Sequence, residues 1–385
     1  MSLTITPGQT PVYQWLVEAK LTPNVQRNVE RLAGSEDVRH VAVLPDIHLG
    51  RNVNNGCVAA TVDLVYPEAV GGDIGCGYSA IALHGSPELL AKKETVQEIL
   101  RRLYRLVPVL KQRDRPVWPA RLDTPSLRAE PLIRESRREG AYQLGSLGSG
   151  NHFVEFQKDE TDQVWILVHS GSRGMGQVIT DFHLQRATTS TTGLHYLDMR
   201  NDAGSAYLHD MEWAIQYATV NRLTILGRAV EIMEAVCRVE ADEASYLDCP
   251  HNFARRETHV GQTFLVHRKS ANSARPEETA IIAGSAGTPS FIVRGRGDER
   301  ALCSSSHGAG RLLSRTDARR RFSATEVRRQ LEKVRFDDRA LEGLRDEAPA
   351  AYRDIHKVLR AQRDLVRQER RLTPLLSFKY RDLRR

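Results

Sequence analysis

An acid and a thiol stand three residues apart in the stretch 70–77, which reads Val-Gly-Gly-Asp-Ile-Gly-Cys-Gly. Glycine permits backbone turns that other residues avoid, so this stretch can direct the side chains of Asp73 and Cys76 to one point. A carboxylate and a thiolate that converge are typical ligands of a metal ion. Taken alone, a tight turn with a buried free cysteine is the simpler interpretation. The metal hypothesis therefore requires further ligands elsewhere in the chain.

Four histidines occupy comparable positions. His152 follows a loop with three glycines, His169 ends an apolar run and begins a Gly/Ser loop, and His251 lies in Cys-Pro-His-Asn. His307 lies between three serines and a Gly-Ala-Gly stretch, so its neighbours have almost no side chain to cover it. One such histidine alone is more typical of a core residue than of a ligand, but the recurrence of the arrangement favours ligands.

Together these residues indicate a chemistry. One carboxylate, one thiolate and three histidines could hold two divalent ions with the thiolate as a bridge, and His307 would remain free as a nucleophile. Two metal ions beside glycine-rich loops and arginines suit phosphoryl or nucleotidyl transfer. No regular spacing joins these residues, so their convergence is a hypothesis.

Composition sets limits on the class of protein. The chain has 385 residues, a net charge of +7 and 41% hydrophobic residues, which suffices for a substantial core. Its five scattered cysteines are typical of reduced thiols, so we expect a cytoplasmic protein without a signal peptide or a membrane span. The basic surplus is compatible with a polyanionic partner or with an ordinary solvated surface.

The apolar pattern indicates which elements must position these residues. A buried strand is expected over 40–44, with Asp46 and His48 in the loop that follows it, and another strand over 164–168. Further strands are expected at 263–266, 278–282, 291–293 and 373–378, and helices at 24–33, 87–106, 205–237 and 354–372. We therefore predict an α/β (α+β) fold with mixed β-sheets, built as one domain over residues 1–385.

Several separate motifs, in order, resemble the RtcB family of RNA ligases over about residues 41–379. The motifs are Pro45-Asp46-x-His48, Asp73-Ile74-Gly75-Cys76-Gly77, Gly148-Ser149-Gly150-Asn151-His152-Phe153, His169-Ser170-Gly171-Ser172-Arg173-Gly174, His251-Asn252, Arg268-Lys269 and His307-Gly308-Ala309-Gly310-Arg311. Members of this family join RNA 2′,3′-cyclic phosphate or 3′-phosphate ends to 5′-hydroxyl ends. The resemblance implies a single domain with the site in a central metal-binding cleft.

The resemblance also implies roles. Cys76 would bridge two Mn²⁺ ions, of which one is also held by Asp73 and His152 and the other by His169 and His251. His307 would attack the α-phosphate of GTP and carry GMP through a phosphoramidate bond. Asn151 and Arg173 would hold phosphates as catalytic residues. The residue types alone do not select manganese, because thiolate and imidazole bind several first-row metals.

Further residues are assigned to substrates by the same resemblance. The GTP site would comprise Asn151, His152, Glu155, Asn252, Gly284, Ser285, Ser290, His307, Gly308, Ala309, Gly310, Tyr352 and Lys379, with Tyr352 stacked on guanine. RNA or phosphate contacts would come from Asp46, Lys269 and Arg311. Expected partners are RNA with broken ends and an archease-type activator.

The chain also departs from the family pattern. Ser270 replaces the glycine that usually follows Arg-Lys, the usual Pro-Gly-Ser-Met loop reads Ala283-Gly284-Ser285-Ala286, the 50–56 loop is poorer in glycine, and the chain continues past Lys379. These changes predict a divergent, short paralogue for RNA repair or tRNA splicing. A metal-dependent RNA-end phosphoesterase and a non-catalytic RNA- or nucleotide-binding paralogue are the alternatives, although neither needs a nucleophilic His307.

Overall fold

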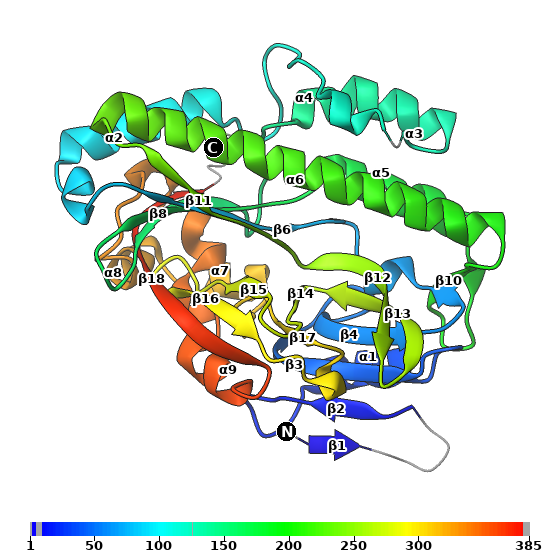
Figure 1. The fold of residues 1–385 in the computed structure, drawn as a ribbon. Helices are drawn as coiled ribbons and strands as arrows, with labels where there is room; N and C mark the ends of the chain where they lie inside the picture. The colour runs from blue at the N-terminus through cyan, green and yellow to red at the C-terminus, as the bar shows by residue number, and fades with distance from the viewer. Residues whose placement is uncertain (1, 5–9, 125, 380–385) are drawn as a thin grey trace.

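The computed structural model describes residues 2–4, 10–124 and 126–379 and combines helices with several β-sheets (Figure 1). Among the described residues, six strands form one sheet in the order β1 (Ser2–Thr4), β2 (Val12–Gln14), β3 (His40–His48), β4 (Asn55–Thr61), β13 (Gln262–Lys269) and β12 (Asn252–His259). Only β2 and β3 are parallel in this sheet, so it is mixed. The predicted α/β (α+β) class with mixed sheets is confirmed, whereas the division into a single domain stays a prediction.

A second sheet carries most of the remaining strands. Within the described part of the chain its order is β11 (Ala241–Pro250), β6 (Gly77–Leu83), β8 (Val164–Ser170), β7 (Phe153–Lys158), β18 (Val366–Lys379), β16 (Ser290–Gly295) and β15 (Thr279–Ile282). Smaller sheets join β5 (Leu64–Val65), β10 (His195–Asp198) and β9 (Thr188–Thr189), and β14 (Ala271–Ser273) with β17 (Ser304–Ser306). Strands 241–250 and 252–259 were not predicted, because their exposed charged residues obscure the apolar alternation.

Helices cover one face of the second sheet. The long α6 (Asp202–Cys237) crosses β6 and β8 beside α2 (Lys93–Leu106) and α5 (Arg173–Leu184) (Figure 1). Fully buried Ile166, Val168 and Ile225 belong to the apolar cluster between them. The side chain of Asn201 caps α6 by accepting hydrogen bonds from the N–H groups of Ala203 and Gly204. This layer fixes the positions of the strand ends that carry the site.

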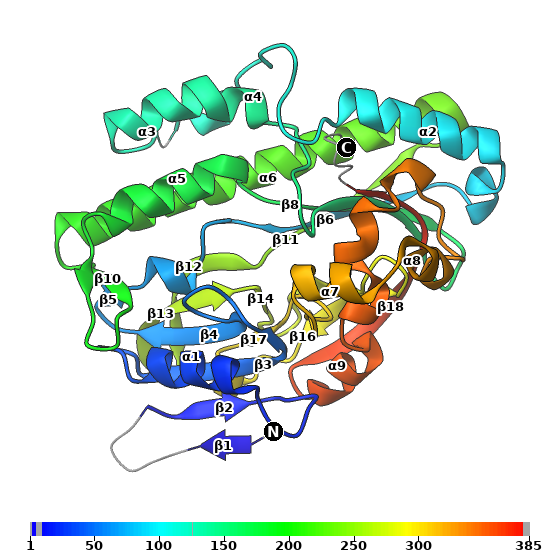
Figure 2. The same ribbon diagram turned by 180° about the vertical axis from the view of Figure 1, so that it is seen from behind.

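The six-stranded sheet is covered on both faces. On one side it packs on α1 (Pro23–Ala33), which lies beside β3 and β4 in Figure 2. Buried Val29 and Val41 belong to the apolar cluster between α1 and this sheet. On the other it packs on β16 and α9 (Ile355–Ala361), with Leu44 and Phe291 in the shared cluster. The remaining helices are α3 (Glu130–Glu135), α4 (Ala141–Gln143), α7 (Arg315–Arg321) and α8 (Ala324–Gln330).

Two predicted boundaries are wrong. The helix expected over 354–372 ends at Ala361, and the segment Val366–Lys379 is a strand between β7 and β16. Arginines on this strand are mostly exposed, while Leu372, Leu376 and Phe378 are buried, so pairing with two neighbours decides the conformation over local helical spacing. The expected helix over 87–106 is divided into a 3₁₀ turn, Pro87–Leu90, and α2.

The third correction concerns Asp46 and His48, which lie within β3 and not in a loop after it. The pairing of β3 with β4 shifts register between Val43 and His48, around Pro45, which has no N–H to donate. Opposite the shift, Gly56 has a φ of 77°, and a Cβ there would lie 2.7 Å from Asp46 Oδ1. The irregularity therefore holds the carboxylate of Asp46 inside the fold.

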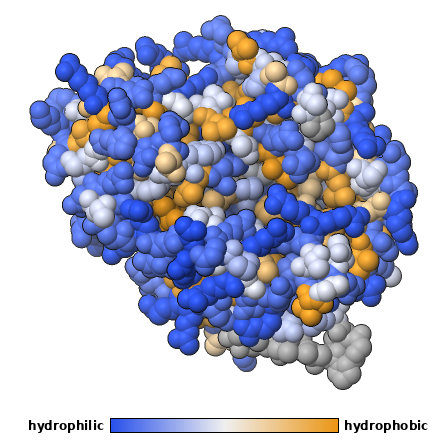
Figure 3. Space-filling view, viewed as in Figure 1, coloured by the Kyte–Doolittle hydropathy of each residue, from blue (hydrophilic) through white to orange (hydrophobic). Residues whose placement is uncertain are grey.

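The face of the molecule drawn in Figure 3 is mainly hydrophilic, with scattered hydrophobic areas between the hydrophilic side chains. In the described ranges, none of the helices has both the length and the apolar character that crossing a bilayer requires. The C-terminal extension past Lys379, residues 380–385, lies outside the described residues.

Candidate active site and metal centre

A cleft of about 720 Å³ is lined by both large sheets. The six-stranded sheet contributes residues of β3 and β12, and the seven-stranded sheet contributes the ends of β6, β7, β8 and β18. Asp73, Cys76, His169, His251 and His307 all line it. Residues separated by more than two hundred positions in the chain are thus brought to one place.

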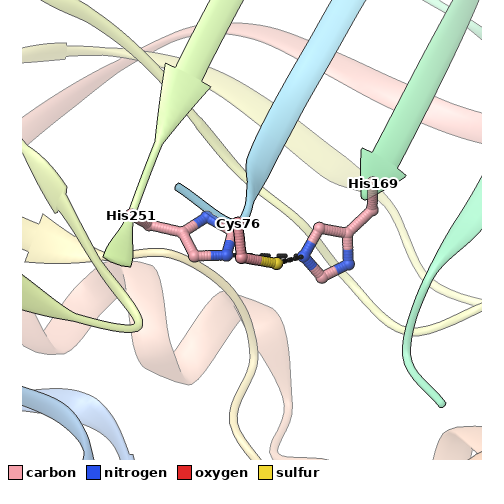
Figure 4. A group of neighbouring side chains, drawn as sticks. All are labelled: Cys76, His169 and His251. Atoms are coloured by element: carbon pink, nitrogen blue, oxygen red, sulfur yellow. Dashed lines mark hydrogen bonds between the residues drawn. The ribbon is translucent and has the colours of Figure 1, made fainter. Parts of the chain in front are cut away.

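Cys76 lies at the centre of two groups of potential metal ligands. Its Sγ is 3.3 Å from His169 Nε2 and 3.5 Å from His152 Nε2. One group is Cys76, His169 and His251, and the other is Asp73, Cys76 and His152, so the thiol is common to both. Figure 4 shows Cys76 between the rings of His169 and His251. His169 lies in β8, and His251 lies at the junction of β11 with β12.

Backbone contacts fix the loop that carries Asp73 and Cys76. The N–H of Gly75 donates to the carbonyl of Asn252, and the N–H of His251 donates to the carbonyl of Cys76. Gly75 has a φ of 70° and lies so close to α6 that an added Cβ would be 2.8 Å from Ile215 Cα. The glycine-rich sequence thus allows this turn to press against the helix.

Backbone carbonyls also orient two of the histidines. Nδ1 of His152 is 3.0 Å from the carbonyl of Leu147, and Nδ1 of His169 is 3.0 Å from the carbonyl of Asn151. Each Nδ1–H therefore donates to a carbonyl, and the lone pair of each Nε2 faces Cys76. Outer carbonyls of this kind are typical of metal-binding histidines.

The donor set fits divalent metal ions. Nε2 of His169 is 3.4 Å from Nε2 of His251, and Oδ2 of Asp73 is 3.1 Å from Nε2 of His152. Asp73 Oδ1 and His251 Nδ1 are buried without a hydrogen-bond partner. Burial lowers the pKa of His169 and of His251 well below the usual value, so both rings are neutral and free to act as ligands. Too few protons lie between these atoms to join them by hydrogen bonds alone, and a bound cation would satisfy them.

His307 lies beside this centre and is oriented by a buried carboxylate. Its Nδ1 donates to Oδ2 of Asp46 at 2.7 Å, and its ring centre is 4.6 Å from that of His251. The backbone N–H groups of His307 and Gly308 donate to the same oxygen at 3.2 and 3.3 Å. Donation from Nδ1 leaves the lone pair on Nε2, which is the atom a nucleophilic imidazole uses.

The structure gives Asp46 a different place from the predicted one. Its side chain is fully buried beneath His307, so we assign it to positioning of that ring and not to contact with RNA or phosphate. No sequence signal joins these residues, because 261 positions separate them. His48, on the same strand, lines the cleft, and its Nδ1 donates to the carbonyl of Asp46.

Most residues predicted for GTP do lie around the cleft. Those that line it are Asn151, Asn252, Gly284, Ser285, His307, Gly308, Ala309, Gly310, Tyr352 and Lys379. His152 and Ser290 lie deeper; Ser290 Oγ accepts from the N–H of Gly284 at 3.2 Å and so supports the loop. Asn252 also holds the Asp73 loop, since its Nδ2 donates to the carbonyl of Asp73 at 2.9 Å.

Glu155 does not reach the cleft surface. It is buried next to Ser377, whose hydroxyl donates to it at 3.0 Å, and next to Gln157. Burial raises its pKa to about 7 although Lys379 opposes this shift. Its predicted contact with guanine therefore requires that a neighbouring side chain move.

Glu347 was missed in the sequence and organises one wall of the cleft. Its carboxylate accepts hydrogen bonds from Arg311 Nη1 at 2.9 Å and from the hydroxyl of Tyr352, and pairs with Arg315 and Lys379. Burial alone would raise its pKa, but these cations outweigh burial and lower it to about 2. A glutamate in a short 3₁₀ turn has no distinctive sequence signal, so only the fold identifies it.

The three predicted basic residues differ in position. Arg311 lines the cleft, but its guanidinium is bound to Glu347, Tyr352 and backbone carbonyls. Lys269 Nζ donates to the carbonyl of Glu68, and Lys269 is not among the described residues that line the cleft. Arg173 begins α5 with a φ of 57°, and its guanidinium lies 3.4 Å from Nδ1 of His152.

Comparison with known proteins identifies the family of this chain. A family model described as tRNA-splicing ligase RtcB matches residues 27–120 and 121–380. The RNA-splicing ligase RtcB of Escherichia coli K12 is 34% identical over 94% of this chain and 95% of its own length. The RNA-splicing ligase RtcB of Mycobacterium tuberculosis is 30% identical over 90% and 98%, and the tRNA-splicing ligase RtcB of Methanococcus maripaludis is 28% identical over 86% and 85%. The predicted resemblance is confirmed, and the chain belongs to the RtcB family of RNA-splicing ligases.

Proposed function

We propose that this chain is an RNA ligase that uses GTP and two Mn²⁺ ions to join 2′,3′-cyclic phosphate or 3′-phosphate ends of RNA to 5′-hydroxyl ends. One observation carries the proposal: the two ligand groups that share Cys76 lie in the same cleft as a histidine whose Nδ1 is held by a buried aspartate. Membership of the family agrees with it, since the relatives are named RNA-splicing or tRNA-splicing ligases.

Each part of the site has a task in this chemistry. Asp73, Cys76, His152, His169 and His251 would hold the two ions, which when bound would withdraw charge from phosphate groups in the cleft. Asp46 keeps the proton on Nδ1 of His307, so that Nε2 can attack the α-phosphate of GTP. A phosphorus–nitrogen bond forms, the bond to the β-phosphate breaks, and pyrophosphate leaves. Water would first open a 2′,3′-cyclic phosphate to a 3′-phosphate. An oxygen of the 3′-phosphate would then take GMP from His307 as the phosphorus–nitrogen bond breaks. The 5′-hydroxyl would finally attack the activated 3′-phosphate, lose its proton and release GMP.

Other cleft residues would bind the nucleotide. The 283–290 and 308–310 segments offer small residues and backbone N–H groups that allow phosphate oxygens to approach. Tyr352 and Lys379 lie along the same wall, where Tyr352 would stack on guanine. Asn151 and Arg173 would hold phosphates near the metal ions, because both lie next to the metal-ligating histidines.

Covalent labelling tests the proposal. The protein is incubated with α-labelled GTP and Mn²⁺ and separated under denaturing conditions; we expect an acid-labile label on the parent chain and none on His307→Ala. His356→Ala, an exposed histidine outside the cleft, is the matched control and should label normally. Metal content should be the same in all three proteins, because His307 is not assigned as a ligand. An adduct on His307→Ala would refute the mechanism.

The same assay separates the alternatives. A phosphoesterase would release phosphate from an RNA 3′-end or open a cyclic phosphate without joining it to a 5′-hydroxyl, and a binding protein would do neither. Neither alternative needs a histidine positioned by a buried carboxylate, so the Asp46–His307 pair favours the ligase.

The RNA substrate is a separate question. Whether the chain serves RNA repair or tRNA splicing is tested by offering both kinds of RNA, with and without an archease-type partner. We expect the protein to act in the cytoplasm, since its five cysteines are all free.

A further inference from the structure

A second cluster of potential metal ligands lies outside the cleft. His259 ends β12, Glu299 lies in the 3₁₀ turn Glu299–Ala301, and Cys303 immediately precedes β17. None of the three lines the cleft among the residues that the structure describes. Figure 1 shows β12 at one edge of the six-stranded sheet and β17 closer to the middle of the molecule. The cluster therefore joins a sheet edge to the strand that leads to His307.

The ligand atoms of this cluster are close enough for one ion. His259 Nδ1 is 2.6 Å from Glu299 Oε2, and Cys303 Sγ is 3.9 Å from Glu299 Oε1. All three ligand atoms lie within 4.8 Å of one another. Ligands of a tetrahedral zinc ion are roughly 3.5 Å apart, given metal–ligand bonds of about 2.0 to 2.3 Å. Small side-chain rotations are thus enough to complete the site.

The other nitrogen of His259 has the partner that metal-binding histidines use. Nε2 is 3.2 Å from Oε2 of Glu257, a carboxylate that is almost fully buried. Arg268, also fully buried, holds Glu257 with two hydrogen bonds of 2.5 and 3.0 Å. A carboxylate that accepts the second N–H of a histidine fixes the ring and increases its basicity as a ligand. Nδ1 is therefore directed at Glu299 and Cys303.

Access from solvent is also suitable. His259 and Cys303 are buried, whereas the side chain of Glu299 is 48% exposed and gives an ion a path from solvent.

We propose that His259, Glu299 and Cys303 bind one divalent transition-metal ion of the zinc type, separate from the ions of the cleft. Imidazole, carboxylate and thiolate are the usual ligands of zinc, and a water molecule completes the tetrahedron. By binding His259 together with Glu299 and Cys303, the ion links the end of β12 to the turn before β17. Since β17 continues directly into His307, the ion supports the segment that carries the nucleophile without touching the substrate.

Cobalt binding by the full chain tests this site, because a Co²⁺–thiolate bond has a charge-transfer absorption band. Cys76 is removed first by Cys76→Ala, so that any remaining band belongs to another cysteine. We expect this chain to retain a cobalt–thiolate band that Cys76→Ala/Cys303→Ala loses. Cys76→Ala/Cys237→Ala is the matched control, since Cys237 lies at the end of α6 away from both groups of ligands, and it should keep the band.

A second variant covers the case in which the buried Cys303 substitution fails to fold. Glu299→Gln, at the half-exposed ligand, should keep the fold and weaken Co²⁺ binding in the Cys76→Ala background by at least about tenfold. Loss of a mere hydrogen-bond partner of a metal ligand already has an effect of that size, and Glu299 is proposed as a direct ligand. Equal cobalt binding with and without Glu299→Gln, or a band that survives Cys303→Ala, would overturn the proposal and leave an ion-pair network only. Neither readout depends on ligase activity, so this result stands apart from that of the GTP labelling.

Discussion

At the scale of single residues, the geometry of the site depends on hydrogen bonds between buried polar atoms, for which bulk water is not an alternative partner. Asp46 is the clearest case, because one of its oxygens accepts the Nδ1 proton of His307 and two backbone N–H groups. A carboxylate in this position selects the tautomer in which Nε2 has the lone pair. The reactivity of His307 should therefore depend on a residue that does not touch the nucleotide.

Asp46→Asn tests this dependence. The amide keeps the shape of the side chain but can present an N–H to Nδ1, which favours the wrong tautomer, so we expect covalent GMP formation to slow by about 10³-fold or more. Rapid-quench measurement of the adduct gives the rate, and metal content should not change. A rate within a few-fold of the parent would show that Asp46 does not position His307.

Cys76 should matter for metal binding more than for folding. A thiolate bridges two ions readily near neutral pH, whereas an alkoxide does so poorly, so Cys76→Ser should lower the metal content of the cleft sharply. Metal analysis of the purified, dialysed protein measures this, with Cys237→Ser as control. Two cleft ions per chain in Cys76→Ser would contradict the bridging role.

The local sequence indicated the candidate metal ligands and His307, but not the residues that position them. Asp73, Cys76 and the four histidines could be selected because glycine, serine or strand ends flank them, and that signal lies within a few residues. The roles of Asp46 and Glu347 could not be predicted, since each depends on contacts made across long stretches of chain. Residue type and local flexibility are encoded nearby, whereas the partner of a buried carboxylate is a property of the tertiary fold.

At the scale of elements, strand ends and the loops between them place the ligands. His169 ends β8, His152 precedes β7, and Cys76 precedes β6, three neighbouring strands of one sheet. The apolar runs over 164–168 and 205–237 predicted β8 and α6 because both are buried along most of their length. The second half of the C-terminal strand was predicted, over 373–378, whereas its first half, 366–372, was assigned to a helix. That arginine-rich half has no alternation, and only pairing with β16 and β7 makes it extended.

At this scale we predict that the ion pairs between Glu347 and its neighbours, including Lys379 at the end of β18, stabilise the wall of the cleft. The buried Glu347 carboxylate compensates Arg311, Arg315 and Lys379, of which Arg311 and Lys379 are largely buried and Arg315 is half exposed. Glu347→Gln leaves the two largely buried cations unpaired and should lower the free energy of unfolding at pH 7 by about 3 kcal/mol. Urea unfolding measures the change. The exposed Glu332→Gln is the control and should differ little from the parent.

The free energy of unfolding of the parent and that of Glu347→Gln should also depend differently on pH. The pKa of Glu347 falls from 4.5 to about 2 in the folded state, so between these values the unfolded chain binds a proton that the folded chain does not. The parent therefore loses stability as the pH falls through this window, and Glu347→Gln lacks that contribution. The difference in unfolding free energy between the two proteins should shrink from pH 5 to pH 3; a constant difference would contradict the assigned pKa.

At the scale of the whole molecule, the candidate metal centre joins segments that the chain does not connect directly. Its potential ligands come from the turn before β6, the loop before β7, the end of β8 and the junction of β11 with β12. Contacts between these segments are largely polar and buried, and Asp73 Oδ1 and His251 Nδ1 have no partner of their own. Ions bound there would satisfy these atoms in the folded state, while the unfolded chain has no such arrangement of ligands.

Metal should therefore stabilise the fold by mass action. Each ion that binds only the folded chain adds about 2.7 kcal/mol at a free concentration 100 times its dissociation constant. We expect Mn²⁺ to raise the unfolding temperature of the chelator-treated parent, and chelator to reverse the rise. Cys76→Ser should lose most of this increase because it weakens both ligand groups at once, whereas His307→Ala should keep it, since His307 contributes to neither. An equal rise in Cys76→Ser and the parent would mean that the stabilising ions lie elsewhere, and loss of the rise in His307→Ala would make that histidine a ligand and not the nucleophile.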